Sequence, residues 1–153
     1  MADKLNDRCA VTPSLYYDNA SAALDWLERA FGFELRFSIT DENGAVQHAV
    51  MAHGDLRLMF GQAGWSDWAK SPKSVGGVNT GGVHIQVDNV DAHCAQARAS
   101  GATILAEPGD QFYGDRTYRA VDLEGHVWSF GQFLRNVPAK EMEDTTGLKV
   151  NVK

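Results

Sequence analysis

The sequence predicts an α+β fold made of two tandem strand–helix–strand–strand–strand modules. Two observations support this prediction. Strand and helix patterns follow one another in the same order twice along the 153 residues, and the two copies align at one constant offset of 70 residues. At this offset Tyr17-Asp18-Asn19 falls on Val87-Asp88-Asn89, and Phe60 falls on Phe130. Because anchors far apart in the chain share one offset, an internal repeat explains the pattern.

The first copy, module 1, spans residues 11–61. Residues 11–17 alternate between apolar and polar side chains, which predicts a strand. A helix is expected next, because apolar residues recur at helical spacing from Ala23 to Phe31. Asn19 is suited to cap the start of this helix, and Gly32 its end. Residues 33–40, 45–52 and 56–61 are predicted strands, with Asn43-Gly44 in the first turn.

Residues 62–80 are predicted to form a long linker that contains Trp65 and Trp68. Connections of this length without regular structure are uncommon in compact domains, so we expect a module linker or a functional lid. The two tryptophans either stack on an aromatic ligand or pack against the domain or a second subunit.

The second copy, module 2, spans residues 81–133. We expect a strand at 82–87, a helix from Val90 that is capped by Asp88-Asn89 and closed by Gly101, and a strand at 102–106. A loop at 107–113 should precede two strands, 115–122 and 126–133, joined by a turn at Glu124-Gly125. Residues 1–10 and 134–153 are expected to be terminal extensions, the latter running along the surface or packing on a partner chain.

Composition excludes several classes of protein. Fourteen basic against twenty acidic residues give a formal net charge of −6, which argues against nucleic-acid binding. No apolar run approaches the roughly 18 residues of a membrane span, and no apolar N-terminal segment suggests secretion. The two cysteines are too few for a metal knuckle, so we expect free thiols and a cytoplasmic location.

Three segments together resemble a known family. Asp18–Phe33, Tyr113–Arg116 and Asp122–Gly131 are similar to the first helix and the final strands of glyoxalase/bleomycin-resistance-like members of the vicinal oxygen chelate superfamily. The resemblance covers residues 11–133. It implies curved mixed sheets around a cleft, with a helix on the outer face of each sheet. It also implies a homodimer, because this family builds its clefts by pairing modules within one chain or across two.

The same resemblance gives positions for a metal. In metal-dependent members, each module supplies one ligand from its first strand and one from its last. These positions correspond to Thr12, Met59, Gly82 and Ser129, and none is a usual ligand for a divalent metal. We therefore expect no native catalytic metal. A displaced divalent-metal site that uses His48 and His84 stays open as an alternative.

Strand alternation identifies the side chains that should line the cleft. Leu58 and Phe60 should face the helix, as should Trp128 and Phe130. The expected cleft residues, with the two linker tryptophans as a lid, are Tyr16, Arg57, Met59, Trp65, Trp68, His84, Gln86 and Ser129.

Several polar candidates have two interpretations. His84 is a candidate general base, ligand hydrogen-bond donor or metal ligand, or else a half-buried strand histidine with a structural partner, and His48 has the same alternatives. Arg116 either binds a polar ligand end together with Asp115 or forms a local ion pair. The remaining histidines are expected to be structural or on the surface: His126 structural, His53 and His93 solvent-facing.

These observations favour a protein that binds a small, partly aromatic or apolar molecule in a cleft without a native catalytic metal. The alternative is a metal-dependent lyase, isomerase or dioxygenase of the same superfamily. The residues leave open whether the protein is an enzyme.

Overall fold

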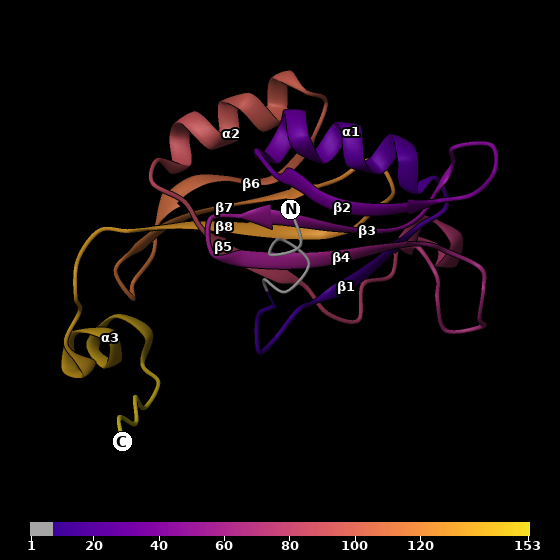
Figure 1. The fold of residues 1–153 in the computed structure, drawn as a ribbon. Coiled ribbons are helices and arrows are strands. Elements are labelled where there is room, and N and C mark those ends of the chain that lie inside the picture. Colours follow the sequence, from indigo (N-terminus) through magenta and orange to yellow (C-terminus); the bar gives the residue numbers. More distant parts are fainter. Residues whose placement is uncertain (1–7) are drawn as a thin grey trace.

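Two four-stranded mixed sheets, one from each module, form the body of the protein (Figure 1). This is a computed structural model, and it describes residues 8–153. Module 1 contains β1 (Ser14–Tyr17), α1 (Ala20–Phe31), β2 (Glu34–Thr40), β3 (Val46–His53) and β4 (Leu56–Gln62). Its strand order is β1-β4-β3-β2, with β1 parallel to β4 and the other pairs antiparallel.

Module 2 repeats this topology. It contains β5 (Val83–Gln86), α2 (Val90–Ala99), β6 (Thr103–Asp110), β7 (Asp115–Val121) and β8 (Val127–Phe133), in the order β5-β8-β7-β6. Again the first strand runs parallel to the last. The predicted α+β fold of two tandem modules is confirmed.

The predicted caps at the start of both helices and at the end of α1 are confirmed, whereas α2 ends at Ala99 with Ser100 as its C-cap, one residue before the predicted Gly101. The side chain of Asn19 accepts a hydrogen bond from the backbone N–H of Ala22, and that of Asn89 accepts one from Ala92. Gly32 ends α1 in the left-handed conformation, with φ of 75°. Equivalent helices therefore start from equivalent capping residues.

One predicted boundary in module 2 is wrong, and the linker contains an element that the sequence did not predict. β6 continues to Asp110, so the loop expected at 107–113 begins four residues later. Pro108 is tolerated there because the pairing of β6 with β7 shifts register between Ala106 and Gly109, where no ladder hydrogen bond is needed. The linker is not devoid of structure, since a short 3-10 helix, η2, occupies Pro72–Val75.

The C-terminal extension also contains a helix. α3 (Ala139–Thr146) is supported by an ion pair between Lys140 and Asp144 at 3.0 Å. Residues 134–153 are here called the C-terminal arm; the arm leaves the sheet at the end of β8, and α3 lies away from the two sheets (Figure 1). No residue of α3 is buried. No helix in the part of the chain that the structure describes is long and apolar enough to cross a membrane.

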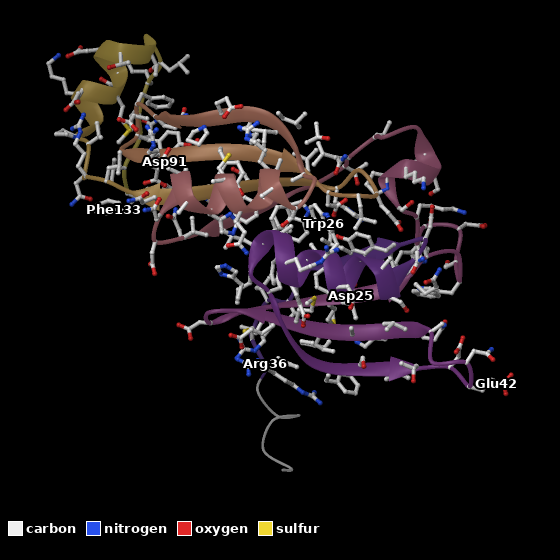
Figure 2. All side chains as sticks on the ribbon, turned by 90° about the horizontal axis from the view of Figure 1, so that it is seen from above. Asp25, Trp26, Arg36, Glu42, Asp91 and Phe133 are labelled. Carbon is white, nitrogen blue, oxygen red and sulfur yellow. The ribbon has the colours of Figure 1, made fainter. Side chains whose placement is uncertain are left out.

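α1 and α2 lie next to each other on the same face of the two sheets (Figures 1 and 2). The modules share one core, in which the ring of Phe31 is 5.3 Å from that of Trp128. Between the helices, Trp26 Nε1 donates a 2.8 Å hydrogen bond to the carbonyl of Ser100. Because both helices cover one face, the opposite face of each sheet, here called the open face, lacks such a cover.

Burial follows the predicted strand alternation. Tyr17, Leu58, Phe60, Trp128 and Phe130 are completely buried. Their neighbours along the strands point to the open face and are exposed or half-buried: Tyr16, Met59, His84, Gln86 and Ser129.

Candidate functional site

A pocket of about 670 Å³ lies where the first strands of both modules meet the linker. Its wall combines Pro13 and Tyr16 from the β1 segment with Trp68, Val75 and Val78 from the linker. The volume falls within the range of about 300–1,000 Å³ that is usual for small-molecule pockets.

Three aromatic rings form a cluster at this pocket. The Tyr16 ring centroid lies 5.5 Å from that of Trp68 and 6.1 Å from that of Trp65, and the two indoles are 4.8 Å apart, all edge to face. Trp65 and Trp68 are 63% and 65% exposed, although large aromatic side chains are normally buried. Rings gathered and left open in this way form a stacking surface for an aromatic molecule.

The chain holds this cluster in place from both sides. The backbone N–H of Gly64 donates to the carbonyl of Ala69 at 2.8 Å, which closes the segment that carries both tryptophans, and Ala69 itself is completely buried. On β4, a Cβ at Gly61 would approach the ring of Tyr16 to 3.2 Å. A glycine at this position therefore lets the ring lie across the neighbouring strand.

Two polar side chains in the pocket wall have structural roles. His126 Nε2 lies 2.8 Å from the carbonyl of Tyr16, and since a carbonyl only accepts, Nε2 carries the proton. Asn79 accepts from the backbone N–H of Val127 at 3.0 Å and donates to Gly125 at 2.9 Å. The structural role predicted for His126 is confirmed, whereas no pattern in the sequence marks Asn79.

On the open face of module 2, four side chains form a hydrogen-bonded chain. His84 Nδ1 lies 2.8 Å from Ser129 Oγ, and His84 Nε2 lies 3.4 Å from Gln86 Nε2. The same Gln86 nitrogen donates to Asp115 Oδ2 at 3.0 Å. The structure thus brings together His84, Gln86 and Ser129, which were predicted to line one cleft.

This chain assigns the tautomer of His84. Gln86 Nε2 is a donor, so His84 Nε2 accepts and Nδ1 carries the hydrogen that is donated to Ser129 Oγ. The hydroxyl proton of Ser129 is then left to point elsewhere. With a proton on Nδ1, His84 orients Ser129 as a hydrogen-bond donor and is not placed to remove the serine proton.

A second glycine makes room for this chain. A Cβ at Gly131 on β8 would lie 2.8 Å from His84 Nε2 and 3.2 Å from Gln86 Nε2. Gly131 is paired with Gln86 as Gly61 is paired with Tyr16, so each module uses a glycine on its last strand to admit side chains from its first. Neither glycine was identified from the sequence.

A family model for the Glyoxalase/Bleomycin resistance protein/Dioxygenase superfamily matches residues 7–130. The chain belongs to this superfamily. The resemblance that the three sequence segments indicated is therefore confirmed.

Relatives within the superfamily agree with this assignment. The chain is 31% identical over 147 residues to an uncharacterized protein of Mycobacterium bovis, covering 91% of this chain and 93% of that protein. An uncharacterized protein of Mycobacterium tuberculosis H37Rv is also 31% identical, with 91% and 83% covered.

Two solved structures illustrate the fold. TioX from Micromonospora sp. ML1 superimposes with a TM-score of 0.67 at 30% identity, over 83% of this chain and all of TioX. The fosfomycin resistance protein FosX from Listeria monocytogenes, solved with Mn(II) and sulfate, has a TM-score of 0.58 at 13% identity, over 90% and 96% of the two chains. The likeness to FosX shows the fold alone.

Metal-dependent members of the superfamily prompt a test of the donor set in this chain. Thr12 and Gly82 precede the strands, and the residues in register with Met59 and Ser129 are Ser14 and His84. The two pairs in register, Ser14 with Met59 and His84 with Ser129, offer one imidazole, two hydroxyls and a thioether. Catalytic zinc usually has three protein ligands drawn from His, Cys, Asp and Glu, so this set does not fit such a metal.

The displaced site that the sequence left open is not assembled either. His48 lies on β3 opposite Gly61, with its ring 6.1 Å from that of Phe37, whereas His84 belongs to the sheet of module 2. Within residues 8–153, no three His, Cys, Asp or Glu side chains are grouped so that they could hold a metal ion.

Both candidate arginines are engaged within the protein. Arg57 donates at 2.9 Å to the carbonyls of Gly54 and Leu56 in the β3–β4 turn. Arg116 is an ion-pairing residue, but its partners are Asp91 at 3.0 Å and Asp110 at 2.7 Å rather than Asp115. The hydrogen bonds that Arg116 donates to these two carboxylates raise its pKa above the ordinary value.

His93 corrects the prediction of a solvent-facing side chain. It is half-buried between the modules, where Nε2 donates to the carbonyl of Phe31 at 3.0 Å and Nδ1 accepts from the Tyr118 hydroxyl at 2.6 Å. Burial lowers the pKa of His93, and nearby His53 lowers it further. His53 is half-buried too, with its ring 5.5 Å from that of Phe33.

Proposed function

We propose that this protein binds a small molecule whose aromatic or apolar part enters the pocket between the two modules. The aromatic cluster of Tyr16, Trp65 and Trp68 carries this proposal. Two indoles more than 60% exposed beside a pocket of about 670 Å³ supply a large binding surface.

The open face adds a polar element to this proposal. Ser129, held by His84, supplies one oriented hydroxyl donor on the sheet of module 2. This hydroxyl lies outside the pocket wall, so it would serve a polar part of the ligand that extends from the pocket along the open face.

Binding is tested with 2-naphthamide, a neutral bicyclic probe, by backbone-amide NMR titration. We expect shifts confined to Tyr16, Trp68 and the residues that line the pocket. Tyr16→Ala and Trp68→Ala should each weaken binding about five- to tenfold, because each removes an aromatic contact. Phe112→Ala is the matched control, since Phe112 is 45% exposed but lies outside the pocket wall. Shifts that spread over the surface, or that both cluster variants retain, would contradict the proposal.

We further propose that ligand binding needs no metal, and the donor chemistry at Ser14, Met59, His84 and Ser129 supports this. The test is elemental analysis after equilibration with Ni²⁺, Zn²⁺, Mn²⁺ or Fe²⁺ and desalting. Far less than one metal per chain is expected. About one tightly held metal per chain, lost in His84→Ala, would overturn this part of the proposal and reopen the lyase, isomerase or dioxygenase alternative.

We propose a second copy of the chain as a protein partner, with the C-terminal arm as part of the contact. In support, Leu134 and Leu148 are 44% and 68% exposed on the arm, and Phe133 beside it is 61% exposed. Light scattering during gel filtration should give twice the chain mass, and removal of residues 139–153 should lower it to one chain mass. A monomeric full chain would refute this.

A further inference from the structure

The pocket between the modules carries a positive charge with no carboxylate in its wall. Lys70 lines the pocket beside Trp68, and within the described part of the chain no Asp or Glu joins it there. Acidic residues outnumber basic ones in this protein, which has a formal net charge of −6. The local charge of the pocket wall is therefore opposite in sign to the net charge of the protein.

Lys70 is not neutralised by its surroundings. Among residues 8–153 it belongs to no ion pair within 4.0 Å. The ammonium of Lys70 thus keeps its three hydrogen-bond donors for another partner.

Among the described residues of the wall, the other polar side chains that are not bonded to a backbone group carry hydroxyls. Tyr16 accepts from Ser14 at 3.5 Å, so its own proton stays available, and Thr80 adds a third hydroxyl to the lining. His126 and Asn79 are already bonded within the protein. The wall consequently presents hydrogen-bond donors beside aromatic rings, which is the complement of an anion attached to an aromatic body.

We propose that the pocket binds an aromatic carboxylate, with Lys70 at the acid group and Tyr16 and Trp68 at the rings. This inference rests on the proposed function, because it names the ligand class of the same pocket.

The test compares three probes that share one ring system and differ in charge: 2-naphthoate, 2-naphthamide and 2-naphthylmethylamine. At low salt we expect 2-naphthoate to bind about two- to fivefold more tightly than the amide, a range typical of one partly exposed charge pair. The protonated amine should bind more weakly than the amide. Added salt should reduce the advantage of the carboxylate, since screening acts on exposed charges.

Variants test whether Lys70 causes the preference for 2-naphthoate over 2-naphthamide. Lys70→Gln should bring the affinity for 2-naphthoate down to that for 2-naphthamide, while Lys70→Arg keeps most of the difference. Lys73→Gln removes the same charge from η2, outside the pocket wall, and should leave the difference intact.

The outcomes separate this inference from the proposed function. If none of the three probes shifts the pocket resonances, the proposed function fails. If all three bind there with equal affinity, or if Lys70→Gln and Lys73→Gln have equal effects, the pocket binds aromatic molecules but the anionic class is wrong.

Discussion

The hydroxyl of Tyr17, at the end of β1, donates a 2.7 Å hydrogen bond to Asp122 Oδ2, beside the β7–β8 turn. The same carboxyl oxygen accepts from Trp128 Nε1 at 3.0 Å, and Oδ1 accepts from two backbone N–H groups. Next to it, Glu124 accepts from the backbone N–H of Asn19 at 2.8 Å at the start of α1. The turn of module 2 thus binds the first strand and first helix of module 1.

Tyr17→Phe tests how much this contact between the modules contributes. Both Tyr17 and Asp122 are buried, so the lost hydroxyl leaves a carboxylate short of one donor. We expect the free energy of unfolding to fall by about 1.5–3 kcal/mol, the range for hydrogen bonds to charged groups. Urea unfolding measures it, with Tyr113→Phe as the control because Tyr113 is 42% exposed. Equal stability of the two variants would show that the hydroxyl adds nothing.

His93 makes stability depend on pH. Burial lowers its pKa in the folded protein, so below about pH 6.5 the unfolded chain binds a proton that the folded chain resists. The stabilisation is therefore complete above pH 6.5 and is lost as pH falls below it.

Urea midpoints measured from about pH 7.5 to 5.5 should therefore fall less steeply for His93→Gln than for the natural protein. Parallel curves for the two proteins would show that His93 does not carry the effect.

Gly131→Ala should change the tautomer of His84. The added Cβ would lie 2.8 Å from Nε2, so the imidazole, as the end of a side chain, has to leave its position between Ser129 and Gln86. We expect imidazole NMR to show loss of the Nδ1–H form of His84. The free energy of unfolding should fall by about 1–2 kcal/mol because the added methyl group overpacks the site. Gly109→Ala is the control, since its nearest neighbour is 3.8 Å away. An unchanged His84 spectrum would contradict the proposed chain.

The sequence predicted faces well but strand register poorly, and the reason is geometric. Side chains alternate with a period of two, so Thr12 and Ser14 point to the same side and alternation cannot choose between them. The choice depends on the pairing of β1 with β4, which sets Ser14 against Met59 across 45 residues of chain. The same holds for Gly82 and His84 beside Ser129.

Contacts between the two modules could not be predicted from the sequence either. The helical pattern of Val90, Cys94 and Ala97 marks the buried face of α2, and His93 lies at its border. In the fold His93 also packs against the ring of Phe31 from the other module and donates to its carbonyl, and no local pattern reports that neighbour. Likewise, the linker tryptophans could be suspected of binding, but their contact with Tyr16 required the fold.

Gly61→Ala tests the aromatic cluster through the β4 backbone position that contacts the ring of Tyr16. Its Cβ would approach two ring carbons of Tyr16 to 3.2 Å, so the ring has to shift and its edge contacts with Trp65 and Trp68 change. Because Trp26 and Trp128 are buried elsewhere, a change in tryptophan emission reports mainly the two linker indoles. We expect altered emission and 2-naphthamide binding weakened about two- to fivefold, in line with the energy of one aromatic pair.

In a Tyr16→Ala background the same glycine substitution should have no effect on binding, because the ring that it displaces is gone. An equal loss in both backgrounds would mean that Gly61 acts through the strand and not through Tyr16.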